Sequence, residues 1–231
     1  VAPKVHMGDV DDQVVERFKL HLLDSGLSKT TANNYLRDIS ARFGRAIKSK
    51  AFTGPNPCAG VERLKLEETP PPYLTKEQID TLLTAAEAHS NEMHWFCLLG
   101  IFEGLRLGEI VNAQWQWFDW QGKLLNLPSD ETFSVKSHKG RSVPLNYRLV
   151  EAMQPHAHES GYLFEAGKPT GKTTSGAWVY RYSPRRVFAT VLKRAKLDEK
   201  RITPHVLRHT FGTQLARAGV SIYKIREWMG H

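Results

Sequence analysis

The sequence has very little cysteine and no long apolar run, and both absences narrow the class of protein. Its 231 residues include two cysteines, Cys58 and Cys97, in unrelated sequence contexts. A disulfide framework is therefore not expected, and a reducing cytoplasm suits the chain. The most apolar stretch, 93–102, is interrupted by His94 and is too short to span a bilayer. The first residues lack the apolar core of a signal peptide, so we expect a cytoplasmic protein with no membrane partner.

Metal-ligand clusters and carboxylate triads are missing from the sequence as well. His, Cys, Asp and Glu residues do not recur at the spacing of a metal site, so we expect neither a metal nor another cofactor. What is abundant is positive charge, because 32 Lys and Arg residues face 24 Asp and Glu residues and give a net charge of +8. Such a balance favours a polyanionic partner, most often nucleic acid, although an ordinary basic surface would give the same numbers.

Three consecutive prolines, residues 70–72, mark the clearest boundary along the chain. Proline cannot continue a helix and favours an extended backbone, which is typical of a linker. We therefore predict a helical domain over residues 1–68, a linker over 69–72 and a second domain over 73–231. Hydrophobic residues make up 41% of the chain, enough for packed cores. The mixture of helical and strand patterns predicts a mainly α fold with a small antiparallel β-sheet.

Helical periodicity dominates the first domain. Apolar residues recur at helical spacing from Val10 to Leu23, and Gly26 ends that helix. A second helix is predicted to begin near Ser28 or Thr30, with an apolar stripe on one face and basic residues on the other. A basic helix face is usually a solvated one, but in a DNA-binding protein it would contact backbone phosphates. The residues predicted to make such contacts here are Arg42, Arg45 and Lys48.

The second domain begins with a helical pattern, continues with strand patterns and returns to helices. Residues 75–78 have the sequence of a capping box, and a buried helix over 92–103 is broken at Gly104. Turn residues separate several short apolar runs that follow. Strands are predicted over 124–127, 132–136 and 141–145, and further helices over 146–154, 175–196, 204–218 and 221–229.

Basic residues concentrate in the interval 168–208, which contains eleven Lys and Arg residues against only Asp198 and Glu199. Tyrosine and phenylalanine residues are interleaved with them. This composition is typical of a surface that contacts DNA phosphates. The residues predicted to contact DNA in this interval are Arg181, Arg185, Arg186, Lys193 and Arg194.

His205 and Arg208 lie in the first turns of a predicted helix that begins after Thr203. A spacing of three residues places both side chains on one face of the helix, away from the apolar stripe that contains Phe211. Their position near the electropositive end of the helix suits an anionic oxygen. A capping histidine next to a surface arginine is the alternative interpretation of the same pair.

Arg106 is predicted to open a short helix after Gly104. Its planar guanidinium can bind two phosphate oxygens at once. Glu109, one turn further on, either orients that guanidinium or acts as an ordinary first-turn carboxylate.

Lys136 and His231 stand next to turns that would leave their side chains free. Lys136 precedes a short polar turn and is predicted at the tip of a β-hairpin, where it is either a solvated edge charge or a proton donor. Lys139 and Arg141 compete with it for the second role. Gly230 is a helix-ending residue, and His231 stands just beyond it.

The order and wording of these segments resemble the tyrosine recombinase family, the phage-integrase type of site-specific recombinase. Gly104–Glu109 resembles the first arginine box of that family, and Lys136–Pro144 resembles its lysine hairpin. His205–Thr213 and Ile225–His231 together resemble its second box. The resemblance covers residues 73–231, and the N-terminal helices resemble the family's SAM-like core-binding domain less specifically. Any one motif is weak evidence, but four in the same order favour membership.

The resemblance implies a role for each of the cationic residues and for the carboxylate. Arg106 and Arg208 would hold the scissile phosphate, and His231 would donate a hydrogen bond to it. His205 would assist proton transfer at the nucleophile. Lys136 would protonate the departing 5′ oxygen. The carboxylate of Glu109 would support the site from behind.

A tyrosine nucleophile is also implied, and it would form a covalent 3′-phosphotyrosyl bond that needs neither ATP nor a metal. The family places it a few helical turns after the last histidine, and none of the seven tyrosines of this sequence stands there. We therefore expect the 231 residues to bind double-stranded DNA at a specific site, as a tetramer associated with the nucleoid, without cutting it. A cleavage-dead DNA-binding regulator and a type IB topoisomerase-like relaxer are the alternatives.

Overall fold

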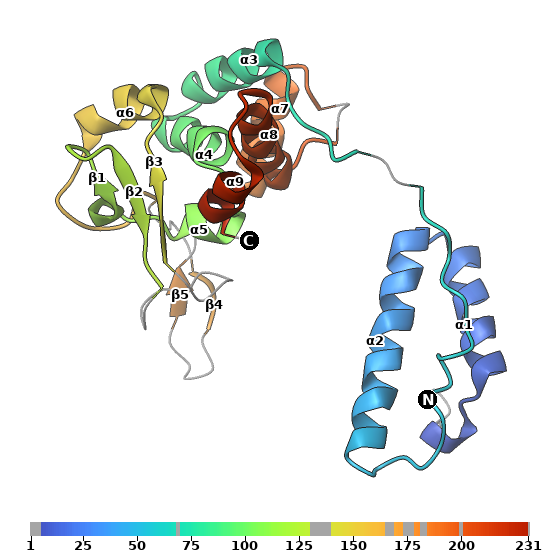
Figure 1. Cartoon of the computed structure of the whole chain (residues 1–231). Helices are drawn as coiled ribbons and strands as arrows, with labels where there is room; N and C mark the ends of the chain where they lie inside the picture. The colour runs from blue at the N-terminus through green and yellow to red at the C-terminus, as the bar shows by residue number, and fades with distance from the viewer. Residues whose placement is uncertain are drawn as a thin grey trace. The chain divides into compact units, whose positions relative to one another are not determined.

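The computed structural model describes residues 6–67, 70–129, 140–164, 169–172, 178–180, 184–198 and 201–230. The chain divides into two compact units, residues 1–70 and residues 71–231 (Figure 1). Among the described residues, none of the helices is both long enough and apolar enough to cross a membrane.

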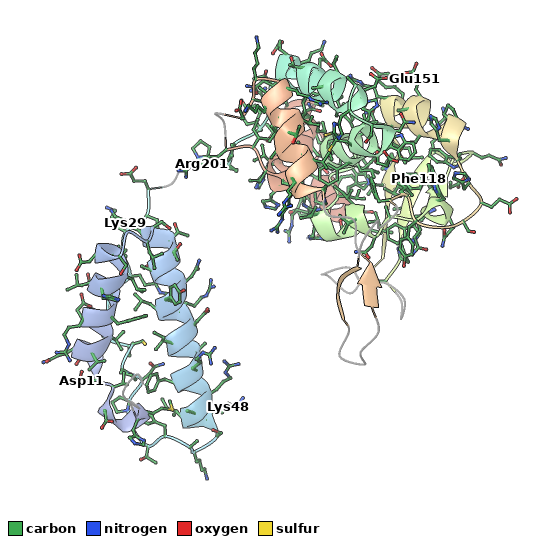
Figure 2. The ribbon with its side chains drawn as sticks, turned by 180° about the vertical axis from the view of Figure 1, so that it is seen from behind. Asp11, Lys29, Lys48, Phe118, Glu151 and Arg201 are labelled. Atoms are coloured by element: carbon green, nitrogen blue, oxygen red, sulfur yellow. The ribbon has the colours of Figure 1, made fainter. Side chains whose placement is uncertain are left out.

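The first unit consists of a short 3-10 turn, η1 (Met7–Asp9), and two helices, α1 (Asp12–Asp24) and α2 (Lys29–Lys48). Both helices are capped at the N-terminus by a side-chain oxygen: Asp11 accepts from the amide of Val14 at 2.8 Å, and Ser28 accepts from the amide of Thr31 at 3.2 Å. Figure 2 labels Asp11 and Lys29 at these two helix starts. The apolar faces of the helices pack together and bury Val15, Leu22, Ala32, Leu36 and Phe43.

The segment that follows α2 returns along the two helices and is fixed by side chains of both. The amide of Asn33 pairs with Leu64 twice, donating to its carbonyl and accepting from its backbone N–H, each at 2.9 Å. Lys19 of α1 donates to the carbonyl of Glu62 at 3.1 Å. These contacts order a stretch that has no helix or strand of its own.

The helices of the second unit pack around one that is buried on every side. That helix is α4 (Asn91–Phe102), and it lies between α3 (Lys76–Glu87) and α8 (Pro204–Arg217). Gly100 of α4 allows a close approach, because a Cβ there would lie 2.9 Å from the Cβ of Leu207. The other helical elements described in this unit are α5 (Leu107–Val111), η2 (Trp115–Trp117), α6 (Tyr147–Met153), η3 (Gln154–His156), α7 (Arg185–Arg194) and α9 (Ile222–Met229).

An antiparallel sheet of three short strands packs against this helical body: β1 (Phe118–Asp119), β2 (Leu124–Leu127) and β3 (Arg141–Pro144) (Figure 1). In its register Leu125 of β2 faces Val143 of β3, and both side chains are buried. A separate antiparallel pair is formed by β4 (Pro169–Lys172) and β5 (Trp178–Tyr180). The prediction of a mainly α fold with a small antiparallel sheet is confirmed.

One predicted element is wrong: the single helix expected over 175–196. Residues 178–180 form strand β5, and the helix of this region, α7, begins only at Arg185. Aromatic and β-branched residues such as those of 178–180 favour strands, and Pro184 disfavours the helical conformation of the residue before it. The strand predicted over 132–136 lies outside the described residues.

Candidate active site

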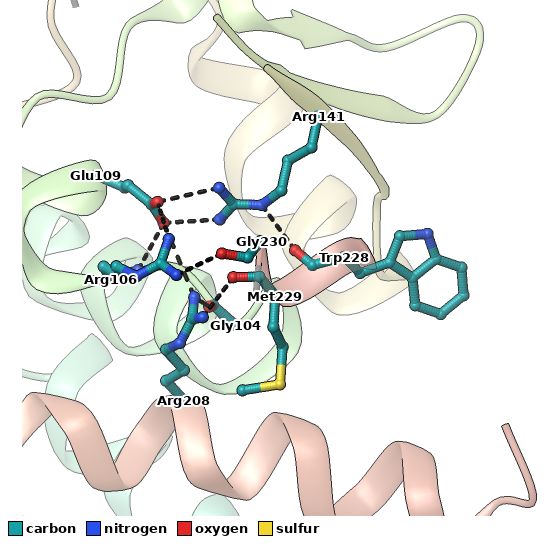
Figure 3. Close-up of polar contacts among 8 residues, drawn as sticks. All are labelled: Gly104, Arg106, Glu109, Arg141, Arg208, Trp228, Met229 and Gly230. Carbon is teal, nitrogen blue, oxygen red and sulfur yellow. Dashed lines mark hydrogen bonds and ion pairs between the residues drawn. The ribbon is translucent and has the colours of Figure 1, made fainter. Parts of the chain in front are cut away.

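Glu109 lies at the centre of a group of arginine side chains. It belongs to α5 and is 3% exposed. Its carboxylate accepts from the backbone and side chain of Arg106, at 2.8 and 2.9 Å, and from two nitrogens of Arg141, at 3.0 and 2.7 Å (Figure 3). Burial alone would raise the pKa of Glu109, but the hydrogen bonds and charge of Arg141, together with the hydrogen bonds from Arg106, lower it. The carboxylate is therefore ionised at neutral pH.

Arg208 is buried in the same group, with its side chain 2% exposed. Its Nη1 donates to the carbonyl of Gly104 at 2.6 Å, its Nη2 donates to the carbonyl of Met229, and Nη1 lies 4.0 Å from a carboxylate oxygen of Glu109. Burial and the charge of Arg106 lower the pKa of Arg208 to about 10, so the group stays cationic at neutral pH. The prediction that Arg208 projects away from the core is wrong, because backbone carbonyls supply partners that allow a guanidinium to be buried.

The last three residues of the described chain each offer a carbonyl to a different arginine. Trp228 accepts from Arg141 Nε at 2.7 Å, Met229 accepts from Arg208, and Gly230 accepts from Arg106 Nη2 at 2.7 Å. The indole of Trp228 points away, so only its carbonyl takes part (Figure 3). Carbonyls at the end of a helix lack intrahelical partners and carry partial negative charge, which the three cations satisfy. Gly230 ends α9 in the left-handed conformation, with φ +68°.

We call Arg106, Arg141 and Arg208 the arginine cluster. Among the described residues, their three positive charges surround one carboxylate, Glu109, which leaves two positive charges in excess. Their side chains are 22%, 5% and 2% exposed, so Arg106 is the member that an anion from solvent meets first. The excess charge in a mostly buried setting favours an anionic ligand such as a phosphate.

A cavity of about 400 Å³ is lined by Arg106 and by the first turn of α8. His205 is exposed in that turn and lines the cavity together with Arg106. Thr203 occupies the N-cap position of α8 as predicted, but its side chain makes no capping hydrogen bond. The rest of the lining is mainly apolar and comes from Leu105, Leu107, Arg185, Phe188, Ala189, Leu192, Ile202 and Pro204.

His205 has a second histidine beside it. The ring of His209 lies one helical turn along α8, with a distance of 4.4 Å between ring centroids and an angle of 75° between the planes. Burial and the charges of His205 and Arg208 lower the pKa of His209. His209 is therefore neutral at neutral pH, and it adds no charge beside the exposed ring of His205.

Comparisons with known proteins identify the family. Residues 72–231 match the phage integrase family, and residues 2–57 match the phage integrase SAM-like domain. The chain belongs to the phage integrase family. A tyrosine recombinase of Pseudothermotoga lettingae is 26% identical, with 98% of this chain and 76% of that protein covered. The tyrosine recombinase XerD of Caulobacter vibrioides is 28% identical, with 96% of this chain and 74% of that protein covered.

Solved structures of integrases share the fold. The Tn1549 transposon integrase in complex with a circular intermediate DNA superposes with a TM-score of 0.74 at 22% identity, covering 97% of this chain and 79% of that one. A lambda integrase dimer bound to a COC′ core site gives a TM-score of 0.67 at 17% identity, covering 99% of this chain and 81% of that one. The phage integrase fold is thus established for both units of the chain.

The structure brings together some of the predicted site residues and does not describe others. Arg106, Glu109 and Arg208 lie in one cluster, and His205 faces the adjoining cavity. Lys136 and His231 lie outside the described residues. The assignment of roles to these residues stays a prediction.

The residues predicted to contact DNA are exposed in α2 and α7. Arg42, Arg45 and Lys48 are exposed on α2, the last of them at the C-terminal end of the helix (Figure 2). On α7 the exposed residues are Arg185, Arg186, Lys193 and Arg194, of which Arg194 contacts the ring of His89 at 3.2 Å. Arg181 lies outside the described residues.

Arg141 was missed as a member of the site, since the sequence suggested it only as a competitor of Lys136 for the role of proton donor. A guanidinium held in an ion pair with a carboxylate is a poor proton donor. The alternation of side chains along β3 could have placed Arg141 in the site. Arg141 and Val143 are two residues apart, and Val143 is 1% exposed, so both side chains leave the strand on its buried side.

Proposed function

We propose that this phage integrase is a site-specific DNA recombinase that cuts and rejoins double-stranded DNA through a 3′-phosphotyrosyl intermediate, for the integration or excision of a mobile element. The arginine cluster is the observation that carries the proposal. Among the described residues, it holds three positive charges around one carboxylate, beside a cavity into which His205 also faces. A phosphodiester bound there would meet fixed cations, and phosphoryl transfer by a tyrosine would require no metal.

Arg106 and Arg208, the two arginines to which the resemblance gives a role, would act from different sides of the phosphate. Arg106, the most exposed member of the cluster, would donate directly to the non-bridging oxygens. Arg208 would supply its charge from the buried side, where the low dielectric strengthens the attraction to the charge that develops in the transition state. Glu109 would fix the orientation of Arg106 before the substrate arrives, so that little reorganisation is needed during the reaction.

Proton transfers complete the proposed reaction. His205, exposed on the cavity wall, is suited to take the proton of the attacking hydroxyl. Lys136 and His231 keep the roles that the resemblance implies, protonation of the 5′ oxygen and a hydrogen bond to the phosphate. The family places its tyrosine after the last histidine, a position that none of the tyrosines of residues 1–231 occupies, so these residues by themselves are proposed to bind DNA and polarise the phosphate without cutting.

DNA binding is proposed to use the basic surfaces of both units. The exposed cations of α2 and α7 would contact backbone phosphates, and the solved integrases bound to DNA support such a partner. Recombination exchanges strands between two paired sites, and we propose a homotetramer on DNA that is associated with the nucleoid.

A nicked suicide duplex tests the proposed chemistry. The product of the intact reading frame is incubated with a duplex that carries a nick a few nucleotides downstream of the scissile phosphate. After cleavage, the short fragment with the released 5′ hydroxyl can then diffuse away. We expect a covalent protein–DNA band in the presence of a metal chelator. Binding without any covalent band would leave a cleavage-dead regulator, and relaxation of plasmids that lack a specific site would indicate a topoisomerase.

Arg208→Ala separates chemistry from binding. We expect the rate of covalent complex formation to fall by about 10²–10³, as for the loss of one group that stabilises transition-state charge. The dissociation constant for DNA should change little, because many exposed cations hold the backbone. A uniform loss of binding with an unchanged cleavage rate of the bound complex would contradict the assignment.

A further inference from the structure

The side chain of Arg141 is enclosed by the other members of the candidate site. It leaves the first residue of β3, is 5% exposed, and donates a hydrogen bond from each of its three guanidinium nitrogens. Two of these bonds go to Glu109 and the third goes to the carbonyl of Trp228. A guanidinium that is so enclosed is not available for direct contact with a phosphate.

Glu109 and the end of α9, the two parts of the molecule that Arg141 holds, also contact Arg106 and Arg208, which are proposed to act on the phosphate, Arg106 by direct contact and Arg208 by its charge. Glu109 Oε1 accepts from Arg106 Nη1 as well as from Arg141 Nη1, at 2.9 and 3.0 Å. The carbonyl of Trp228 is followed by those of Met229 and Gly230, which accept from Arg208 and Arg106. Arg141 therefore fixes the carboxylate and the helix end on which the orientation of the other two arginines depends.

We propose that Arg141 is a positioning residue of the recombination reaction: it holds Glu109 and the end of α9 so that Arg106 stays directed toward the phosphate and Arg208 keeps its charge behind it. This inference rests on the proposed function of the arginine cluster. It assigns to β3 a role different from that of the lysine hairpin, because Arg141 acts through its neighbours and transfers no proton.

The charge of Arg141 has a second consequence for Arg106. Each oxygen of Glu109 accepts one hydrogen bond from Arg141, so the carboxylate is largely compensated before Arg106 is considered. Without Arg141 the buried carboxylate would have to draw its compensation from Arg106, which is the member exposed to the cavity. The positive charge available to a phosphate would fall accordingly.

Gly230 lies directly against the guanidinium of Arg141, where a larger residue would not fit without a shift. A Cβ at Gly230 would lie 3.0 Å from Arg141 Nη1 and 3.2 Å from its Cζ, closer than side chains normally approach. The backbone there also has φ +68°. The contact fixes the point at which the chain leaves α9.

Lysine cannot replace arginine in this position. The three acceptors of Arg141 lie around a planar fork, and a single ammonium at the end of a flexible chain cannot reach all of them in the same geometry. Arg141→Lys therefore keeps the charge and removes the positioning. Arg148→Lys is the matched control, because Arg148 pairs with Asp80 at 2.9 Å on the surface, with 34% of its side chain exposed.

The test uses the product of the intact reading frame and measures single-turnover formation of the covalent complex on the nicked duplex at saturating DNA. We expect Arg141→Lys to lower this rate by about 10- to 100-fold, the scale of the loss when a supporting residue is removed or a reacting group is displaced. Its dissociation constant for DNA should stay within about threefold of the wild type, and Arg148→Lys should match the wild type in both. Equal rates for Arg141→Lys and Arg148→Lys would overturn the proposal.

A duplex with a neutral methylphosphonate at the scissile position separates positioning from general damage to the fold. If Arg141 acts by aligning cations on a phosphate charge, the defect of Arg141→Lys relative to the wild type should shrink on this substrate. An equal defect on both substrates would indicate a merely structural role and would count against the proposal.

Two glycine variants keep the proposal testable should Arg141→Lys fail to fold. Gly230→Ala and Gly219→Ala impose the same type of backbone strain, since the φ angles are +68° and +79°. A Cβ at Gly219 meets nothing within 4 Å, whereas a Cβ at Gly230 meets Arg141. We expect only Gly230→Ala to slow covalent complex formation, and equal effects of the two variants would contradict the role of Arg141.

Amide hydrogen exchange distinguishes a failure of this inference from a failure of the proposed function. Arg141→Lys should increase exchange at the C-terminal end of α9, and Arg148→Lys should not. If the wild type forms no covalent complex, the proposed function fails, and exchange then decides alone whether Arg141 holds α9. Unchanged exchange in Arg141→Lys would overturn the positioning role even in an active enzyme.

Discussion

Glu103 and Glu109 lie on either side of Gly104 in the sequence, and both are buried, yet at neutral pH Glu103 is mainly a neutral acid and Glu109 is ionised. Glu103 is 0% exposed, and burial raises its pKa to about 8. One oxygen accepts from the amide of Asn146 at 2.9 Å, and the other has no hydrogen-bond partner among the described residues. Glu109 is 3% exposed, and the arginines beside it lower its pKa.

The difference shows that partners, and not burial, decide whether a buried carboxyl is charged. Water is excluded from both sites, which disfavours the carboxylate form in each. At Glu109 two guanidinium groups restore the lost solvation, and the resulting ion pairs orient the cations of the site. At Glu103 a single backbone amide does not suffice, so a neutral acid connects the end of α4 to the start of α6.

Glu109→Gln tests the comparison of the two buried carboxyl groups and should have the largest effect on stability at neutral pH. The variant removes the carboxylate at the centre of the arginine cluster and leaves its three positive charges around a neutral amide in a mostly buried setting. We expect a loss of about 3 kcal/mol in the free energy of unfolding and a decrease of roughly 6–12 °C in the melting temperature at neutral pH. Thermal denaturation followed by circular dichroism measures it.

The pH dependence of this loss follows from the direction of the pKa shift. The folded pKa of Glu109 lies below its ordinary value of 4.5, so the unfolded chain binds its proton first as the pH falls. The contribution of Glu109 is complete above the unfolded pKa and is lost as the pH falls through the folded pKa. The difference between Glu109→Gln and wild type should therefore shrink as the pH falls below 4.5, and a difference that stays constant there would contradict the ionised state.

Glu103→Gln should give an effect of opposite sign that develops only as the pH rises. The folded pKa of Glu103, about 8, lies above the ordinary value of 4.5, so the folded chain holds a proton that the unfolded chain releases between these values. Wild-type stability should decrease as the pH rises from 4.5 to 8, by an amount on the order of a few kcal/mol. Glu103→Gln cannot ionise and should lack that decrease.

Urea denaturation at pH 5 and pH 8.5 provides the measurement for Glu103. At pH 5 wild type and Glu103→Gln should be similar, because an amide can still accept from Asn146 and the acid is protonated. At pH 8.5 the variant should be the more stable protein. Equal changes in stability between the two pH values for variant and wild type would show that Glu103 is not a neutral acid.

Sequence periodicity predicted most of the elements around the site. The start of α5 after Gly104, the strand 124–127 and the end of α9 at Gly230 were predicted where local rules are strong: a helix N-terminus, an apolar run between turns and a glycine C-cap. Arg106 and Glu109 could be assigned to one cluster for the same reason, since an i, i+3 pair on one short helix must lie close together.

Contacts between distant segments were not predictable in the same way. The burial of Arg208 depends on the carbonyl of Gly104, and the role of Arg141 depends on the carbonyl of Trp228. Backbone carbonyls are present at every residue, so no sequence pattern marks the ones that will receive a guanidinium. The assumption that a charged side chain on a helix faces solvent therefore misplaced Arg208.

The exposed cations of α2 can be compared with the buried arginine cluster in the same way. Replacing one of them should have the smallest effect on stability. Arg45→Ala removes a side chain that is exposed near the end of α2, so the free energy of unfolding should change by less than about 0.5 kcal/mol. If Arg45 contacts a phosphate, the slope of log K against log salt concentration should decrease in magnitude by about 0.9.

Lys224→Ala serves as the control for Arg45→Ala, because Lys224 is also exposed but is paired with Glu227 at 3.2 Å and lies outside the predicted contact surface. DNA affinity measured at several salt concentrations should show the altered slope only for Arg45→Ala. An equal change for both variants would mean that net charge alone drives binding. No change for either would remove Arg45 from the surface. In both cases Glu109 and the α9 carbonyls would still compensate the buried arginines, because these contacts do not depend on DNA.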